Sequence, residues 1–398
     1  MPTWARNLYV LWIGVFIAAI SFSLASPFLP LLLEDVGVKN NLATWSGVAF
    51  SASFLMSAIM SPVWGSLADR YGRKIMIIRS GIGIGSTYIL MAYATSPMQI
   101  VLLRALNGLL SGFIPSAVAL VATNTPEDKL PRSLGMLHTG SAAGQVMGPL
   151  VGGVLGYFLG IKQTLLFSGL TLLLASIVVA FGVKEEASLN AKAKVNPWKD
   201  LAIAFTNRRL LAVLISIMMF QAAVTVLQPV LPLHIKALSG AGAATITIGI
   251  VYSIVGIATI FGAPFWTRLS EKIGGRKVLA YCLAGAGLLC LPQVFATSIV
   301  TFSMARFVFG LFLAGIIPVA NCMVAQSVSC DFRGRAFGIS HSYSQLGAFA
   351  GPLVGGVLAN SYSISAVFWV TAISLLATCW YVTVALRPED KAFSGTIA

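Results

Sequence analysis

Two arginines lie inside long apolar stretches of this 398-residue sequence, where charged side chains are otherwise rare. Arg104 and Arg306 each lie about six or seven residues from the predicted outer end of a stretch, roughly 10 Å at the helical rise. A charge at the centre of a membrane-spanning helix costs about 2.5–3.5 kcal/mol, so it usually has a partner or a function. Each arginine therefore either has a functional role for its charge or extends its side chain to the membrane surface.

Side chains that could carry a proton are also few. Only 12 residues are acidic, and none lies deep in an apolar stretch. Glu34 and Asp35 lie at the end of the first stretch, where they either face an internal cavity or are ordinary interfacial carboxylates. His138 and His341 occupy matched places in the fifth and eleventh stretches. Histidine titrates near neutral pH, which suits a proton relay, although an interfacial hydrogen bond is the simpler role.

Nothing in the sequence indicates covalent or metal chemistry. The apolar stretches contain no paired carboxylates, HxxxH motif or activated nucleophile. The five cysteines have neither CxxC nor metal-ligand spacing, and there is no GxxxxGK[ST] phosphate loop. We therefore expect no enzyme activity, no metal, no cofactor and no use of a nucleotide.

A charged segment between the second and third apolar stretches has a fixed order of glycine, acidic and basic residues. It reads Gly65-Ser-Leu-Ala-Asp69-Arg70-Tyr-Gly72-Arg73-Lys74, and the second half carries a degraded copy. Glycine permits a tight turn, and the carboxylate and basic groups can form charge-assisted hydrogen bonds. The candidate residues of a cytoplasmic gate are Gly65, Asp69, Arg70, Gly72, Arg73, Lys74, Arg132, Glu271 and Arg335.

The octapeptide Gly-Pro-Leu-Val-Gly-Gly-Val-Leu occurs at 148–155 and again at 351–358, which indicates two related halves. Around both copies, glycines spaced four residues apart give a smooth helical face that a neighbouring helix can approach closely. Each proline removes a backbone hydrogen bond and favours a kink. These residues either form a moving interface between the halves or serve helix packing alone: Gly140, Gly144, Gly148, Pro149, Gly152, Gly351, Pro352 and Gly355.

These residues must be positioned by helices in a membrane. Hydrophobic residues make up 57% of the chain and charged residues 10%, compared with about 25% in soluble domains. The apolar runs are about 20 residues long, enough to cross a bilayer as helices. The predicted spans are 8–32, 45–66, 75–94, 98–122, 133–157, 163–183, 208–233, 245–266, 277–296, 299–325, 335–359 and 364–386. We predict an all-α polytopic membrane protein with twelve transmembrane helices in two pseudo-symmetric six-helix bundles.

The charge distribution predicts the topology. Of 26 lysines and arginines, 21 fall in loops or close to span ends on one side of the predicted membrane, three on the other side, and two, Arg104 and Arg306, deeper within spans. By the positive-inside rule, both termini are cytoplasmic. The net charge of +14 is therefore weak evidence for a nucleic-acid partner. The expected units are an N-terminal bundle (1–183), a central cytoplasmic loop (184–207) and a C-terminal bundle (208–398). The loop is either a helix on the inner membrane surface or a disordered linker.

Several motifs together resemble one transporter family. The segment 65–74 resembles the signature loop of the major facilitator superfamily, and Arg104 with Gly108 resembles its fourth-helix motif. The glycine run from Gly140 resembles the fifth-helix motif of its antiporters, and Pro27-Phe-Leu-Pro30 resembles an element of the drug:proton antiporter branch. The resemblance implies proton coupling or substrate-linked conformational change at Arg104. For Arg306 the same role depends only on the internal repeat.

The resemblance implies a plasma-membrane exporter of small amphipathic compounds, driven by the proton gradient. A facilitator or symporter of a sugar or metabolite, or a lipid flippase, is the alternative on the same fold. The expected partners are the substrate and the lipid bilayer, and the expected state is a monomer. Polar and aromatic residues in the spans either face the central cavity or hydrogen-bond between helices. These cavity candidates are Phe16, Phe22, Asn107, Gln145, Gln221, Gln228, Tyr252, Asn321, Tyr343 and Gln345.

Overall fold

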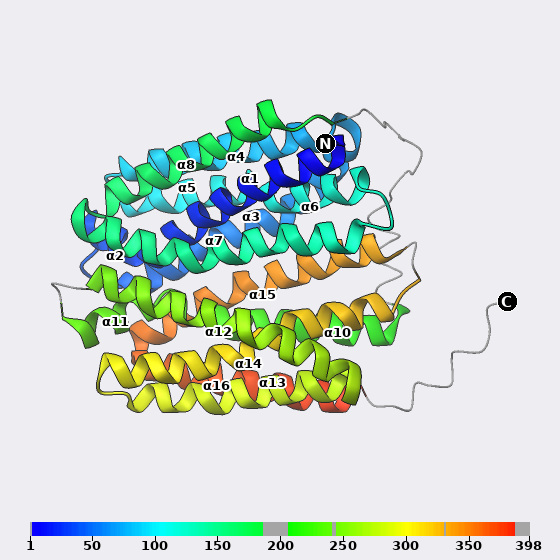
Figure 1. Cartoon of the computed structure of the whole chain (residues 1–398). Helices are drawn as coiled ribbons and strands as arrows, with labels where there is room; N and C mark the ends of the chain where they lie inside the picture. Colours follow the sequence, from blue (N-terminus) through cyan, green and yellow to red (C-terminus); the bar gives the residue numbers. More distant parts are fainter. Residues whose placement is uncertain (1, 186–205, 241–243, 330–331, 387–398) are drawn as a thin grey trace.

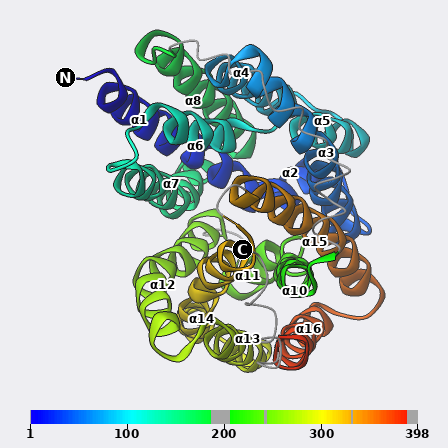
Figure 2. The ribbon, with the colours of Figure 1, turned by 90° about the vertical axis from the view of Figure 1, so that its right-hand side faces the viewer.

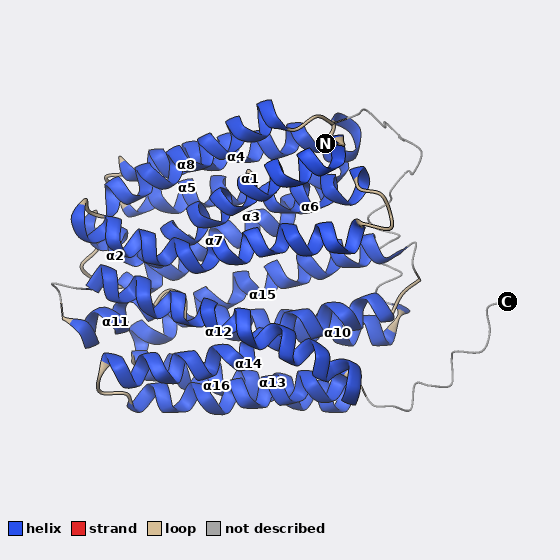
Figure 3. Ribbon diagram, viewed as in Figure 1, coloured by secondary structure: helices blue, strands red, loops and turns tan. Residues whose placement is uncertain are grey.

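The computed structural model describes residues 2–185, 206–240, 244–329 and 332–386, except for the side chains of Asp69 and Pro131. Most of the predicted central loop, residues 186–205, lies outside the described part. Every element in the described part is a helix (Figure 3). The helices form two groups, one from each half of the chain, that lie side by side (Figure 1).

Glycine and proline set the breaks between helices in the first half. Pro27 lies within the 3-10 turn Ser26–Phe28, Pro30 is the second residue of α2, and Gly72 with φ +97° separates α3 from α4. Gly112 with φ +127° separates α5 from α6 within one predicted span. The helices are α1 (Thr3–Ala25), α2 (Leu29–Asp35), α3 (Leu42–Tyr71), α4 (Arg73–Ala92), α5 (Pro97–Leu109), α6 (Phe113–Asn124), α7 (Leu130–Phe158) and α8 (Ile161–Gly182).

Side-chain caps begin several helices of the second half. Asn207 accepts a hydrogen bond from the backbone of Leu210, and Ser298 forms a capping box with Thr301. The helices are α10 (Arg208–Thr225), α11 (Leu231–Ser239), α12 (Ala244–Ile273), α13 (Gly275–Cys290), the 3-10 helix Leu291–Phe295, α14 (Ile299–Gln326), α15 (Arg333–Ser361) and α16 (Ile364–Ala385).

Ten helical segments in the described part are long and apolar enough to cross a membrane. Three of them combine successive elements: α1 with α2, α5 with α6, and α13 with the 3-10 helix that follows it. The glycine-rich helices α7 and α15 are not among the ten, although each has 29 residues, or about 43 Å at the helical rise. The all-α membrane fold in two related halves is confirmed, and the count of twelve spans stays a prediction.

Each half has its own apolar core. One cluster of buried side chains runs from Leu8 to Val183, and the other from Leu210 to Leu386. The second cluster also contains Phe28, Leu31 and Ala43 of the first half, so the two halves are in contact there.

The bundle has two ends that differ in their loops. We call the end at which α2 and α11 finish the Glu34 end, and the opposite end, with the turn between α3 and α4, the Gly72 end. In Figure 1 the Glu34 end is on the left and the Gly72 end is on the right, where the N-terminus also lies. Figure 2 looks onto the Gly72 end and shows α15 next to α3 and α7 next to α12.

Candidate functional site

The two halves meet through two equivalent helix pairs, α3 with α15 and α7 with α12. A Cβ atom on Gly47 of α3 would collide with the carbonyl oxygen of Pro352 on α15. A Cβ atom on Gly249 of α12 would collide with the carbonyl oxygen of Pro149 on α7. The two contacts are related by the internal repeat, because 249 − 47 is 202 and 352 − 149 is 203. Glycine at both places lets the backbones of opposite halves touch.

Two serines strengthen the same helix pairs. The Ser51 hydroxyl donates to the carbonyl of Phe349 at 2.7 Å, and the Ser253 hydroxyl donates to that of Val146 at 2.6 Å. The Thr44 hydroxyl also donates to the carbonyl of Gly356 at 3.1 Å. A hydroxyl bound to a helix carbonyl needs no room for a second side chain, so the close backbone approach is kept.

An ion pair joins the halves at the Glu34 end. The Lys236 ammonium on α11 donates to both carboxylate oxygens of Glu34 on α2, at 2.8 and 2.7 Å. The two side chains are 32% and 42% exposed, so the pair is partly solvated. Glu34 was predicted as a coupling candidate or an interfacial carboxylate, and the structure places it in a contact between halves. Asp35 beside it is exposed.

The halves separate toward the Gly72 end, as a comparison along α3 demonstrates. Gly65 follows Gly47 by 65 − 47, or 18 residues, which is five helical turns, so both face α15. An added Cβ atom at Gly47 meets the α15 backbone, whereas one at Gly65 finds no atom within 4 Å. Over about 27 Å of helix the interface therefore changes from contact to open space.

The same change occurs along α7 and α15. Gly153 contacts Thr245 of α12, with an added Cβ atom 2.7 Å from its carbonyl, whereas Gly135, five turns earlier, has open space. Gly356 contacts Ala43 of α3, with an added Cβ atom 2.5 Å from its carbonyl, whereas Gly338, also 18 residues earlier, has open space. Three glycine pairs, which cover both helix pairs between the halves, thus indicate a molecule closed at the Glu34 end and open at the Gly72 end.

The predicted glycine stripe of α7 packs inside its own half. Added Cβ atoms at Gly144, Gly148 and Gly152 would lie 2.6, 2.7 and 2.8 Å from carbonyl oxygens of α1, and Gly140 faces Trp12 of the same helix. On α15, Gly351 faces Ala222 of α10, and Gly355 faces Val226 directly after that helix. The expectation that this stripe is the moving interface needs correction, because the contacts between halves use the adjacent face. That face holds Gly153, Gly356 and the carbonyls of the two prolines.

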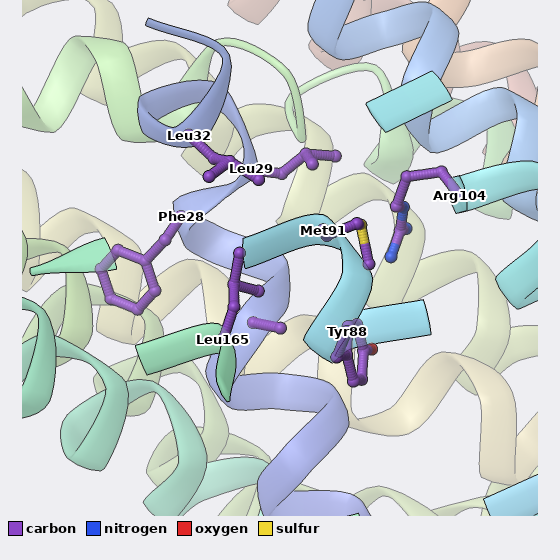
Figure 4. Close-up of a pocket in the computed structure, with 8 residues that line it drawn as sticks. Phe28, Leu29, Leu32, Tyr88, Met91, Arg104 and Leu165 are labelled. Atoms are coloured by element: carbon purple, nitrogen blue, oxygen red, sulfur yellow. The ribbon is translucent and has the colours of Figure 1, made fainter. Parts of the chain in front are cut away.

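Arg104 and Arg306 are buried, 8% and 6% exposed, so neither reaches to a membrane surface. Arg104 lies 5.4 Å from the Phe50 ring centroid and lines a pocket of about 10 Å³ with Tyr88, space for about one water (Figure 4). Arg306 donates to the Gln293 side chain at 3.4 Å. The Nε atoms of both arginines lack a hydrogen-bond partner among the described residues. Such buried cations are energetically costly, which favours a role beyond packing.

At the Gly72 end, the Glu185 carboxylate caps the N-terminus of α4. Its two oxygens accept hydrogen bonds from the backbone N–H groups of Arg73 and Lys74, both at 2.9 Å. Asn7 holds the preceding residue, Lys184, through two hydrogen bonds of 2.7 and 3.0 Å. A carboxylate at a helix N-terminus is favoured by the helix dipole. Glu185 is not among the residues predicted from the sequence, because it follows a distant span and matches no motif.

The other gate candidates are placed as follows. Arg70 lies over the Tyr71 ring at 5.2 Å, and Arg335 lies over the Phe332 ring at 4.7 Å. Arg132 and Glu271 are exposed. In the second copy of the loop, Gly274 with φ +91° repeats the turn made by Gly72. The side chain of Asp69 lies outside the described part, and the gate role of this set stays a prediction.

The cavity candidates separate into distinct environments. The Gln345 amide on α15 donates to the Ser57 hydroxyl on α3 at 2.9 Å, so it bridges the halves. Asn107 is buried and donates to Thr87 at 2.9 Å inside the first half, which is the interhelical alternative. Gln145 is exposed, as are His138 and His341, and Gln228 has a buried side-chain oxygen without a partner. The half-buried candidates are Phe16, Phe22, Gln221, Tyr252, Asn321 and Tyr343.

Sequence signals could have found part of this site. The offset of the internal repeat relates Gly47 to Gly249 and Ser51 to Ser253. An alignment of the two halves would therefore have identified these residues. Lys236 and Glu185 carry no such signal, because their partners come from other helices. In the described residues, no three histidine, cysteine, aspartate or glutamate side chains are grouped to hold a metal ion.

Comparison with known proteins identifies the family that has this architecture. The family model of the Major Facilitator Superfamily matches residues 11–246 and 213–398. The chain is 37% identical over 388 residues to the multidrug resistance protein MdtG of Escherichia fergusonii, covering 96% of this chain and 95% of that one. It is 36% identical over 389 residues to MdtG of Escherichia coli, with the same coverage. A solved structure of the nucleoside transporter NupG superposes with a TM-score of 0.80 at 14% identity, covering 95% of this chain and all of that one. The chain belongs to the major facilitator superfamily of multi-pass membrane transporters.

Proposed function

We propose that the protein exports small amphipathic compounds from the cell in exchange for protons. The observation that carries this proposal is the similarity to multidrug resistance proteins over 96% of the chain. Two gates on opposite ends of a bundle made of related halves are the parts that alternating access requires. The protein acts as a transporter and not as an enzyme, and the proton gradient supplies the energy in place of ATP or a cofactor.

The Gly72 end is proposed to face the cytoplasm of a plasma membrane, with both termini on that side. The charge asymmetry of 21 basic residues against three supports this orientation. In that orientation the structure corresponds to the state that takes up substrate from inside the cell or from the inner leaflet.

Export then needs the converse state, closed at the Gly72 end. Closure would bring Gly65, Gly135 and Gly338, which have open space in this state, against the opposite half. The charged loop with Asp69, Arg70 and Arg73, together with Arg132 and Arg335, would hold that closed state through charge-assisted hydrogen bonds. The Lys236–Glu34 pair and the Gly47 and Gly249 contacts would break as the Glu34 end opens.

Proton coupling is proposed to involve Arg104, with Glu34, Asp35 or His138 as carriers. Burial of Arg104 without a hydrogen-bond partner at Nε supports a site that responds to charge nearby. Protonation of Glu34 would remove one charge of the pair with Lys236, which favours opening of the Glu34 end. Arg306 is the equivalent candidate in the second half.

A pH gradient imposed across proteoliposomes tests the proposal. An antiporter accumulates a fluorescent amphipathic compound against its concentration gradient, and collapse of the pH gradient abolishes accumulation. A facilitator of a sugar or metabolite would only equilibrate its substrate, with no response to the pH gradient. Equilibration alone across a chemically diverse set of compounds would therefore reject export by antiport.

A further inference from the structure

Arg79 is a charged residue inside a membrane span. Neither the helix packing nor the proposed gates account for its charge. The charge count above assigned it to the cytoplasmic side, but it is the seventh residue of α4. Its guanidinium carbon lies 3.4 Å from the centroid of the Trp64 ring, and its Nη2 donates to the carbonyl of Ser111 at 2.9 Å. The Nε and Nη1 atoms are buried and have no hydrogen-bond partner among the described residues.

The second half offers an internal control for the role of this arginine. The Trp64 indole donates to the Leu109 carbonyl at 2.6 Å, and the matched Trp266 indole donates to the Leu311 carbonyl at 2.7 Å. The residue that matches Arg79 is Cys282, since 282 − 79 is the repeat offset of 203. An added Cβ atom at Gly315 would lie 2.6 Å from both Cys282 and Trp266, so the cysteine lies beside the tryptophan. The tryptophan contact therefore forms without a guanidinium.

The surroundings of Arg79 are polar and belong to the interface between the halves. Ser111 lies at the break between α5 and α6, and its hydroxyl is 3.1 Å from that of Ser57. Ser57 accepts the hydrogen bond from Gln345 of the opposite half. Gly65, next to Trp64, has open space around an added Cβ atom, whereas Gly47 on α3 touches α15. The guanidinium thus lies at the level where the halves separate.

The unused donors of Arg79 require an acceptor that the described residues do not supply. A buried N–H group without a partner costs about 1–3 kcal/mol, and more in a charged group. No acidic residue lies deep in a predicted span, and among the described residues no carboxylate forms an ion pair with Arg79. A guanidinium binds carboxylate and similar oxyanions through parallel hydrogen bonds, and stacking on an indole fixes its orientation.

We propose that Arg79, held by Trp64 and the Ser111 carbonyl, is a subsite for the anionic group of transported compounds. The preferred substrates are then amphipathic monoanions with a carboxylate or sulfonate beside an aromatic body. This inference rests on the proposed function, because it assigns a charge preference to the same transport path. It also agrees with the lack of acidic residues deep in the spans, which a cation site would need.

Three naphthalene probes of matched shape test the subsite: 2-naphthoate, 2-naphthamide and (2-naphthylmethyl)trimethylammonium. Equilibrium dialysis against the purified full-length protein in nanodiscs, without any gradient, measures binding of each. We expect the anion to bind about tenfold more tightly than the amide, the difference made by one charge-assisted hydrogen-bonded pair. Arg79→Gln removes this preference, whereas Arg79→Lys keeps the charge and retains part of it. Arg268→Gln, at an exposed arginine of the second half, keeps the full preference.

The outcomes separate the subsite from a helix-packing role. An unchanged anion preference in folded Arg79→Gln protein overturns the proposal. A second variant, Arg79→Cys, introduces the residue that the second half has at the matched position and serves if Arg79→Gln does not fold. A thermal unfolding midpoint within a few degrees of that of the parent protein shows that the variant is folded and that its binding data are valid. If the parent protein itself does not distinguish the three probes, the proposal is also rejected. Because dialysis needs no proton gradient, failure of antiport in proteoliposomes would reject the export mechanism and leave this result intact.

Discussion

At the scale of single residues, Glu185 connects the end of the first bundle to the turn of the charged loop. Its carboxylate binds the first two backbone N–H groups of α4, and Asn7 fixes the residue before it. Two of the four N–H groups that a helix leaves unpaired at its start are satisfied in this way. The same carboxylate leaves little room for a side chain at residue 72, since an added Cβ atom on Gly72 would lie 2.9 Å from Glu185.

The first prediction concerns this cap. Glu185→Gln keeps the shape of the side chain but removes its charge and converts one accepting oxygen to a donor. We expect a destabilisation of about 1 kcal/mol, the usual loss at a helix N-terminus, seen as a lower thermal unfolding midpoint in nanodiscs. Glu127→Gln, at an exposed glutamate of the α6–α7 loop, is the matched control and leaves the midpoint unchanged. Equal midpoints for both variants would exclude a capping role.

A second prediction concerns Asp69 of the charged loop. Asp69→Asn removes the one carboxylate of the motif while keeping its volume. If this carboxylate holds the Gly72 end closed, transport in reconstituted vesicles is abolished, because that state forms too rarely. Expression, insertion and the unfolding midpoint remain those of the parent protein. Full transport by the variant would contradict the gate proposal.

At the scale of helices, sequence patterns predicted where helices span the membrane and where they break. They predicted less well which neighbour each helical face packs against. Apolar runs, Pro27 with Pro30 and the glycine at 72 act locally, so they could be located without tertiary information. The direction of each helical face depends on neighbours. The stripe from Gly140 to Gly152 was recognised, but not that it packs on α1 while Gly153 contacts the other half. Glu185 was missed because the groups that it binds lie on another helix, whereas Arg79 was counted with the cytoplasmic side although it lies inside the predicted span 75–94.

A third prediction compares two glycines on one face of α3. Gly47→Ala places a methyl group against the Pro352 carbonyl and disfavours the closed Glu34 end. Gly65→Ala meets open space in this state but obstructs the converse closure at the Gly72 end. Both variants therefore lose transport, for opposite reasons. Electron paramagnetic resonance distances between spin labels at Glu127→Cys and Lys272→Cys measure the opening in a background without native cysteines.

The two alanines should shift that distance distribution in opposite directions. Gly47→Ala enriches the short distances of a closed Gly72 end, and Gly65→Ala enriches the long distances of the open one. A core substitution that only destabilised the bundle would broaden the distance distribution but would not shift it in opposite directions for the two variants. Equal shifts for both variants would show that the face shared by Gly47 and Gly65 does not set the conformation.

At the scale of the whole molecule, function requires two conformations of similar free energy, and a single sequence encodes both. The structure captures the state closed at the Glu34 end, and no sequence pattern indicates which state predominates. Among the described residues, the polar and backbone contacts that close it are four close glycine–backbone contacts, a few hydroxyl bonds and one ion pair. None of these is individually strong, as a reversible gate requires, because a ligand or proton must overcome their sum.

The ion pair of Glu34 with Lys236 offers a fourth prediction at this scale. An exposed pair contributes about 0.2–1 kcal/mol, which changes the ratio of two states by about 1.4- to fivefold. Lys236→Glu replaces attraction by repulsion, so the fraction open at the Gly72 end decreases by several-fold in the same spin-label experiment. Glu34→Lys combined with Lys236→Glu restores the attraction and the parent distribution. In 1 M salt, charges are screened beyond about 3 Å, so the single and double variants should give similar spin-label distance distributions. A shift that persists unchanged in high salt would attribute the effect to packing of α2 against α11 instead of charge.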